Sequence, residues 1–344
     1  MSTETVSTAL SSEDVALAQA FGARTKELLE EIHKVIVGQD RIVMQVLTAM
    51  FARGHGLIIG VPGLAKTLLV RTLAQCMGWE FKRIQFTPDL MPSDITGTEI
   101  LQTDSASGQR HMTFVKGPLF ANLILADEIN RTPPKTQAAL LEAMQELTVT
   151  SAGHSYHLDP PFFVLATQNP IEHEGTYPLP EAQLDRFMFS INIAYPTREE
   201  ELRIVEETTA REIPPVRKVF TKEEVLKFQA LVRRVPVSAH VMQYAVDLAR
   251  ATRPVGAEAD PFVREYVEWG AGPRASQYLI LGAKALSLLH GKPSPSAVEV
   301  RTVAPSVLQH RVIPNYKATG EGITSLQIVE RLLKNAKEPD YRGK

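Results

Sequence analysis

The chain has 344 residues, more than one ordinary domain core requires, so its length favours two domains. Apolar residues make up 44% and charged residues 22%, a composition typical of globular proteins and unlike that of disordered chains. The net charge of −2 argues against a dominant nucleic-acid-binding surface. The single cysteine, Cys76, excludes an intrachain disulfide and fits a reducing compartment.

The start of the chain and its apolar runs do not indicate export or membrane insertion. Residues 1–10 are polar, and no basic stretch there precedes an apolar run, as a secretory signal requires. The longest apolar runs are strand-sized, far below the roughly 20 residues that cross a bilayer. We therefore expect a cytoplasmic protein with no membrane span.

Helical patterns dominate the first part of the chain. Ser11, Ser12 and Glu13 are typical of a helix cap, and apolar residues then recur at helical spacing in roughly two segments, around Phe21 and around Ile32. This pattern predicts an N-terminal helical segment over residues 1–33.

Strand-like runs begin at Gly56. The five candidates lie at residues 57–59, 81–86, 123–126, 162–166 and 187–193. Several are continuously apolar, which is typical of strands covered on both faces, as in a parallel sheet. Helical patterns at 67–77 and 134–147 lie between them, so residues 34–196 are predicted to form an α/β domain with a five-stranded parallel sheet.

Two stretches between these strands have the pattern of inserted β-hairpins. Residues 98–114 have strand-like ends around a polar centre at 104–109, and residues 147–158 have strand-like ends around Ala152 and Gly153. His154 and His157 in the second hairpin could suggest a metal site. No third or fourth ligand has zinc-type spacing, so both are interpreted as hairpin surface.

The β pattern ends after residue 196. Three helical faces follow, around Phe228, Leu248 and Leu286, and Pro214 with Pro215 interrupts the pattern before them. We predict a linker over residues 197–220 and a small, entirely helical domain over residues 221–344. The fold of the chain's end stays open.

A glycine-rich loop follows the first strand and precedes a helix, the setting of a phosphate-binding P-loop. Glycines let backbone N–H groups turn toward phosphate oxygens, Lys66 can neutralise the β- and γ-phosphates, and Thr67 can offer a hydroxyl to Mg²⁺. Ala65 replaces the glycine that usually precedes the lysine, so an ordinary glycine-rich turn is the alternative. The predicted loop residues are Gly60, Val61, Pro62, Gly63, Leu64, Ala65, Lys66, Thr67 and Leu68.

Two carboxylates end the third strand candidate. Adjacent strand residues point to opposite sides, so the two acids are predicted to have different roles. Asp127 can hold the water shell of Mg²⁺, and Glu128 can polarise the attacking water as a general base. Incidental acids at a solvated strand end are the alternative, which the upstream P-loop argues against.

Further polar residues follow the later strands. Asn169 can hydrogen-bond a γ-phosphate or orient water, although Asn-Pro after a strand is also a common turn. Arg186 follows a short helix, where an arginine is ordinarily a surface residue. For Arg131, Glu142 and Glu146, a solvated surface and a contact between subunits both stay open.

These pieces, in this order, resemble those of the AAA+ ATPases, and the wording of the motifs is similar to that of the MoxR family. The matching stretches are residues 36–40, 60–67 with Ala65 as the family has it, 127–137, 140–146, 166–170, 181–187 and 272–276. The resemblance covers roughly residues 25–315 and is thinner in the second domain.

The resemblance implies roles that spacing cannot show. Val37 and Gly38 would lie against the adenine, and Asn169 would be the sensor residue near the γ-phosphate. Arg186 would be an arginine finger reaching the neighbouring subunit's site, and Arg274 a second sensor that a helical lid carries onto the phosphates. The hairpins match those of the branch shared with magnesium-chelatase and MCM-like motors.

The resemblance implies Mg²⁺-dependent ATP hydrolysis by a hexameric ring, coupled to remodelling or chaperone-like activation of a protein partner. Its relatives suggest von Willebrand factor A-domain proteins as partners. Since Arg186 would come from the next subunit, a lone monomer should be a poor ATPase.

Two other functions were weighed. A nucleic-acid motor of the MCM-like kind is disfavoured by the near-neutral charge and by the absence of Lys and Arg from residues 147–158. A nucleotide-gated scaffold with little turnover is disfavoured by the presence of Glu128, Asn169 and Arg186.

Overall fold

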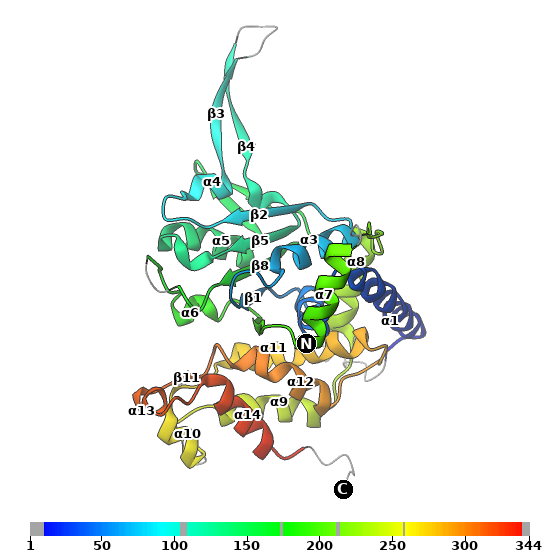
Figure 1. The fold of residues 1–344 in the computed structure, drawn as a ribbon, viewed down its shortest axis with the longest axis vertical. Coiled ribbons are helices and arrows are strands. Elements are labelled where there is room, and N and C mark those ends of the chain that lie inside the picture. The colour runs from blue at the N-terminus through cyan, green and yellow to red at the C-terminus, as the bar shows by residue number, and fades with distance from the viewer. Residues whose placement is uncertain (1–9, 104–108, 173–174, 211–213, 257–258, 339–344) are drawn as a thin grey trace, which may run out of the picture.

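A five-stranded parallel sheet lies at the centre of the computed structural model, which describes residues 10–103, 109–172, 175–210, 214–256 and 259–338. The strand order is β2-β5-β8-β1-β9, and all four neighbouring pairs are parallel (Figure 1). The five predicted strands are thus confirmed, with small shifts at their ends. Their bounds are β1 Gly56–Ile59, β2 Phe81–Gln85, β5 Leu123–Asp127, β8 Phe163–Gln168 and β9 Phe189–Asn192.

Both faces of the sheet are buried, as the continuous apolar runs predicted. In β8, Phe163 and Leu165 belong to one apolar core, and Val164 and Ala166 belong to the other, because successive strand residues point to opposite faces. The first core includes residues of helices α2 (Asp40–Phe51) and α3 (Lys66–Met77). The second includes residues of α5 (Pro134–Glu146), so helices cover the sheet on both sides.

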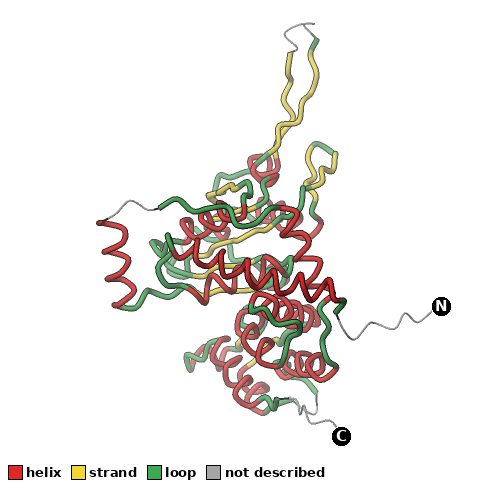
Figure 2. The backbone as a smooth tube through the Cα atoms, turned by 90° about the vertical axis from the view of Figure 1, so that its right-hand side faces the viewer, coloured by secondary structure: helices red, strands yellow, loops and turns green. Residues whose placement is uncertain are grey.

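Both predicted hairpins are present in the α/β domain. The first pairs β3 (Gly97–Thr103) with β4 (Arg110–Lys116), follows the short helix α4 (Pro92–Thr96), and projects far from the body (Figure 2). Most of its predicted polar centre, residues 104–108, lies outside the described residues. The second hairpin pairs β6 (Thr148–Ser151) with β7 (His154–His157).

The two hairpins are joined near their bases. The ring of Phe114 in β4 stacks on that of Tyr156 in β7, with centroids 4.0 Å apart and 9° between the planes. The Ser151 hydroxyl also donates a hydrogen bond of 3.1 Å to the Gly97 carbonyl. Aromatic stacking and this hydrogen bond tie each hairpin to the other.

The N-terminal segment is one continuous helix, α1 (Ser12–His33), rather than the two segments that the spacing suggested. Its predicted cap is confirmed, because the Ser11 hydroxyl accepts a hydrogen bond of 3.1 Å from the Asp14 N–H. Gly22 continues the helix where it lies against Gly291; a Cβ at Gly22 would come within 2.9 Å of the Gly291 Cα. A side chain there would force the two backbones apart.

In the described residues after 220, the regular structure is helical except for one short ladder. The two strands of this ladder, β10 (Val267–Trp269) and β11 (Ile313–Pro314), pair antiparallel. Each is too short to show an alternating apolar pattern in the sequence. The end of the chain, left open by the sequence, forms α13 and α14. The helices are α8 Lys222–Arg234, α9 Ala239–Ala251, α10 Pro261–Tyr266, α11 Pro273–Leu289, α12 Ala297–Leu308, α13 Tyr316–Gly320 and α14 Ser325–Asn335.

The predicted linker contains a helix, α7 (Arg198–Ala210), which has no buried residue over 198–209. Three one-turn elements complete the described chain: η1 Pro118–Phe120, η2 Ile129–Arg131 and α6 Glu181–Leu184. Within the described ranges, every helix is too short or too polar to cross a bilayer.

Helix α1 packs into the same core as the second domain, through Phe21. The Phe21 ring is fully buried, stacks on Phe228 of α8 at 4.4 Å, and meets Phe51 of α2 edge-on at 4.6 Å. We expect Phe21→Ala to destabilise the protein by about 3–5 kcal/mol, since it removes an aromatic ring from a closed core. The midpoint of urea-induced unfolding measures this effect.

The control for this substitution is Val15→Ala on the same helix, where the side chain is partly exposed. Its effect should stay within about 0.5 kcal/mol. Equal effects of the two substitutions would contradict the packing of α1 described above.

Candidate functional site

The loop between β1 and α3 has the backbone of a phosphate-binding turn. Gly63 has φ of 86°, and a Cβ there would meet no atom within 4 Å, so the space above the loop is open. Ala65 caps α3 with φ of 55°, the left-handed region that glycine adopts most easily. This explains why glycine is usual at that position, and the loop accommodates alanine in that conformation.

Lys66 begins α3 and turns its ammonium group back over the loop. Its Nζ donates a hydrogen bond of 2.7 Å to the Gly60 carbonyl. Burial lowers the pKa of Lys66, and the charges of Asp127 and Glu128 oppose that shift. A cation therefore lies at the positive end of a helix, which is a setting that favours bound anions.

Asp127, the last residue of β5, is nearly buried and is held on both carboxylate oxygens. Arg83 of β2 reaches Oδ2 with two nitrogens, at 2.7 and 3.0 Å, and the Thr167 hydroxyl donates to Oδ1 at 2.6 Å. The same Thr167 oxygen accepts a hydrogen bond of 2.8 Å from the Glu128 N–H. One hydroxyl on β8 therefore fixes both acids.

Glu128 leaves the strand in a left-handed conformation, with φ of 56°. Its Oε2 accepts hydrogen bonds from Gln85 at 2.9 Å and from Arg131 at 3.1 Å. Among the described residues, no donor reaches Oε1. One oxygen is thus anchored while the other stays available to a ligand or to water.

A cavity of about 370 Å³ brings the loop, the acids and Asn169 together. Asn169 follows β8, is almost buried, and accepts a hydrogen bond of 3.2 Å from the Ile171 N–H. β5, β8 and β1 are neighbours, so their carboxyl ends meet at one edge of the sheet (Figure 1). The lining residues are Pro62, Gly63, Ala65, Lys66, Thr67, Leu68, Arg83, Asp127, Glu128 and Asn169.

The oxygen atoms at this cavity fit Mg²⁺. The ion takes oxygen ligands and is usually held by one or two protein groups together with substrate phosphates. Thr67 and Asp127 both line the cavity, and the Thr67 hydroxyl has no hydrogen-bond partner in the described part of the chain. A triphosphate bound above the loop would supply the remaining oxygens.

Seven of the predicted site residues do not line the cavity: Gly60, Val61 and Leu64 of the loop itself, and Val37, Gly38, Arg186 and Arg274 from other segments. Val37 and Gly38 precede α2, where the Gln39 side chain donates a long hydrogen bond of 3.4 Å to the Leu64 carbonyl, so this segment lies beside the loop. Arg186 is half-buried after α6 and does not line the cavity. Arg274 pairs with Asp185 at 2.9 Å, one residue before Arg186.

Three residues that hold the acids, Arg83, Gln85 and Thr167, were not predicted from the sequence. Arg83 and Gln85 are two residues apart in β2 and so lie on the same face of the strand, and Gln85 pairs in register with Asp127. This spacing was visible in the sequence. The strand order that brings β2 beside β5 was not.

Arg131, Glu142 and Glu146, whose roles the sequence left open, have different surroundings in the structure. Arg131 contacts Glu128 and also Glu172, at 3.8 Å, and Glu142 accepts a hydrogen bond of 2.8 Å from Thr150 in the second hairpin. Glu146 is exposed at the end of α5. Over the described ranges, no three His, Cys, Asp or Glu side chains gather as metal ligands, and His154 and His157 are exposed on β7.

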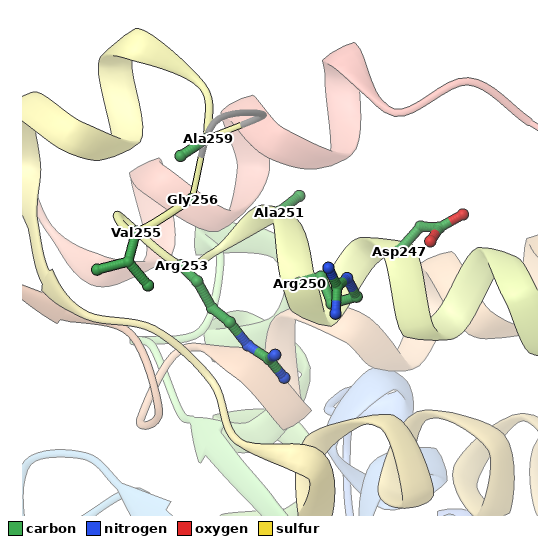
Figure 3. A pocket seen from close by; sticks show the side chains of 7 residues that line it. All are labelled: Asp247, Arg250, Ala251, Arg253, Val255, Gly256 and Ala259. Carbon is green, nitrogen blue, oxygen red and sulfur yellow. The ribbon is translucent and has the colours of Figure 1, made fainter.

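A second cavity lies within the lid, at the end of α9 (Figure 3). It has a volume of about 520 Å³, is lined by Arg250, Arg253 and Asp247 among others, and contains none of the predicted site residues. The predicted chemistry therefore centres on the cavity above α3.

Comparisons with known proteins agree with this architecture. The family described as "ATPase family associated with various cellular activities (AAA)" matches residues 55–189, and the AAA lid domain matches residues 261–332. Chaperone MoxR1 of Mycobacterium tuberculosis is 42% identical over 91% of this chain and 82% of its own length. Protein YeaC of Bacillus subtilis is also 42% identical, over 92% of this chain and 95% of its own.

Two further similarities extend the comparison. Protein MoxR of Methylorubrum extorquens is 29% identical over 82% of this chain and 85% of its own. The crystal structure of a Cytophaga hutchinsonii protein assigned as an ATPase has 41% identity and a TM-score of 0.87, covering 94% of this chain and 98% of that one.

The parallel sheet, the P-loop, the acid-tipped strand and the helical lid define an AAA+ ATPase, a protein that binds and hydrolyses ATP. Within that class, the chain belongs to the MoxR family.

Removing the Lys66 ammonium should weaken nucleotide binding. We expect Lys66→Ala to raise the dissociation constant for ATP about 10- to 100-fold, because charge-assisted hydrogen bonds contribute roughly 1.5–3 kcal/mol. Titration with a fluorescent ATP analogue measures this. Lys82→Ala, on an exposed lysine of β2, is the matched control and should bind normally; unchanged affinity in Lys66→Ala would refute the assignment of the loop.

Proposed function

We propose that this ATPase works as a hexameric ring with Mg²⁺-dependent active sites between subunits, and that hydrolysis drives the remodelling of a protein partner. One observation carries the proposal. The cavity of a single chain contains Lys66, Asp127, Glu128 and Asn169, whereas Arg186 does not line it. Arg83, the arginine among the residues that line the cavity, is bound to the Asp127 carboxylate, so we infer that a second arginine must come from another subunit to contact the γ-phosphate.

Within one subunit, the loop and α3 would bind the phosphates. The backbone N–H groups of the loop and Lys66 would surround the β- and γ-phosphates, and Val37 with Gly38 would border the adenine. Thr67 and the Asp127 carboxylate would hold Mg²⁺, Asp127 through the ion's water shell. When bound, the ion neutralises negative charge on the phosphate oxygens.

Glu128 would act as the general base. Its Oε2 is fixed by Gln85 and Arg131, so Oε1 can accept the proton of a water molecule that attacks the γ-phosphorus. The bond from the γ-phosphorus to the β–γ bridging oxygen then breaks, giving ADP and phosphate. Asn169, beside Glu128 in the cavity, would orient the water or the γ-phosphate.

Arg186 of the neighbouring subunit would complete the charge balance. Negative charge develops on the γ-phosphate oxygens in the transition state, and an arginine delivered from another chain raises GTPase rates by roughly 10³–10⁵. Arg274 forms an ion pair with Asp185, the residue directly before Arg186. We therefore propose that Arg274 contacts the neighbouring subunit's phosphates together with Arg186.

The first hairpin favours a protein partner over a nucleic acid. Leu101 and Met112 pair across β3 and β4, and their side chains are 59% and 57% exposed. Exposed apolar pairs suit contact with a protein surface, and we take them as the contact surface although Arg110, His111 and Lys116 lie on the same hairpin. The relative named Chaperone MoxR1 supports a chaperone-like role, and a von Willebrand factor A-domain protein is our candidate partner.

Two substitutions test the shared site. Glu128→Gln and Arg186→Ala should each retain ATP binding while turnover falls by roughly 10³-fold or more. An equal mixture of the two should regain turnover, because with random mixing about one site in four combines an intact Glu128 with an intact Arg186 next to it. Steady-state phosphate release measures both effects.

Arg198→Ala, on an exposed arginine at the start of α7, is the control and should turn over normally. Full activity of Arg186→Ala alone would rule out its role as an arginine finger. If the mixture stays inactive, the two residues do not act across a subunit boundary.

Partner binding is tested with Glu128→Gln, which should hold ATP and the partner together. A pulldown with ATP should capture a protein that Glu128→Gln/Leu101→Ser/Met112→Ser captures at least about 10-fold less, since two apolar contacts of roughly 1–2 kcal/mol each are lost. In the wild-type background, Leu101→Ser/Met112→Ser should leave basal ATP turnover unchanged. Equal capture by both trap variants would exclude the first hairpin as the contact surface.

A further inference from the structure

Three consecutive lid residues, Gln309, His310 and Arg311, bind the segment that carries Arg186. We define residues 185–192 as the finger segment. At the end of α12, Gln309 donates a hydrogen bond of 2.5 Å to the Ser190 carbonyl, and His310 Nε2 lies 3.0 Å from the Phe187 carbonyl. Both contacts reach main-chain atoms of the finger segment, so the lid holds its backbone.

Arg311 makes most of these contacts. Its guanidinium donates to the carbonyls of Asp185 at 2.9 Å, Phe187 at 2.8 Å and Met188 at 3.3 Å. It also donates to the Asp185 carboxylate at 2.7 Å and to the carbonyl of Val307 in α12. The acceptors on the finger segment lie on both sides of Arg186.

The Arg311 side chain is itself fixed. Its side chain is 2% exposed, and its guanidinium lies over the ring of Tyr278 in α11, 5.1 Å from the ring centroid. The second oxygen of Asp185 is bound by Arg274, also in α11. Two side chains of α11, Tyr278 and Arg274, therefore contact the Arg311 guanidinium and its partner Asp185, so the position of Arg311 depends on the lid.

Arg186, by contrast, has no side-chain hydrogen bond or ion pair within the part of the chain that the structure describes. Its direction is then set by the main chain from which it projects. A planar guanidinium has five N–H donors in a fixed arrangement, so one arginine can hold several carbonyls at once, which a lysine ammonium cannot do in the same geometry.

We propose that Arg311 is a positioning residue: by holding the main chain on both sides of Arg186, it directs that side chain toward the neighbouring subunit's γ-phosphate. The lid of one subunit thus controls the hydrolysis rate in the next. This inference rests on the proposed function, in which Arg186 acts across the subunit boundary.

The test uses mixtures of variant subunits, because they separate the subunit that donates Arg186 from the one that binds ATP. The reference mixture combines Glu128→Gln, which only donates, with Arg186→Ala, which only hydrolyses. In the first test mixture, Arg311→Gln is added to the donating subunit. The turnover regained by this mixture should be about 10- to 100-fold below that of the reference mixture, because displacement of a catalytic group by about 1 Å lowers the rate by up to about that factor.

In the second test mixture, Arg311→Gln is added to the Arg186→Ala subunit instead. That subunit donates no arginine, so its turnover should equal the reference. The KM for ATP should be unchanged in both mixtures, because the P-loop is intact in each hydrolysing subunit. If Arg311 acts in folding alone, turnover should fall equally in both test mixtures. If Arg311 has no role, turnover should fall in neither. Each of these results overturns the proposal.

Two controls complete the experiment. Arg301 lies in α12, the helix that precedes Arg311, and donates hydrogen bonds to the Tyr244 hydroxyl and the Ala336 carbonyl rather than to the finger segment. Arg301→Gln should therefore not lower turnover from the donating subunit. If Arg311→Gln does not assemble, Arg311→Lys replaces it and should show the same asymmetry. An inactive reference mixture refutes the proposed function itself, whereas an active reference with no asymmetry refutes only the role of Arg311.

Discussion

The order of the strands determines where this protein can do chemistry. β1 lies between β8 and β9, and β5 lies on the other side of β8, so the loops after β5, β8 and β1 leave the sheet at the same edge. The P-loop, the two acids and Asn169 come from separate segments of the chain, yet the parallel pairing brings them around one cavity. Each side chain needs only to stand at the end of its strand.

Hydrogen bonds within the sheet then set the finer geometry. Thr167 bonds both the Asp127 carboxylate and the Glu128 backbone, and β2 contributes Arg83 and Gln85 from its side. These residues bind the two acids directly. They hold two neighbouring carboxylates in different environments, which is what two different roles require.

Much of this could be predicted from the sequence because the informative signals are local. A few consecutive residues are enough to recognise a strand followed by a glycine-rich turn and a lysine, or a buried strand that ends in two acids. What could not be predicted depends on neighbours distant in the chain. The contact of Arg83 with Asp127 requires knowing that β2 pairs with β5, and the pairing of Arg274 with Asp185 requires knowing how the lid docks on the core.

The same limit explains the differences in the helical regions. Spacing suggested two segments where α1 is one continuous helix, because its packing against distant parts of the chain, such as Phe228 and Gly291, is not visible in local spacing. The ladder of β10 and β11 joins segments more than forty residues apart, each too short to show a strand pattern.

The stacked rings of Phe114 and Tyr156 have a mechanical consequence. α5 starts six residues after Glu128 and runs directly into β6, and this second hairpin is fastened to the first by the two rings. Any shift of the Glu128 turn that moves α5 would be transmitted through the stacked rings to the first hairpin. Because that hairpin is long, a small rotation at its base would displace its far end by a larger distance. A change at the γ-phosphate that moves the Glu128 turn would thus reach the described strands of the first hairpin.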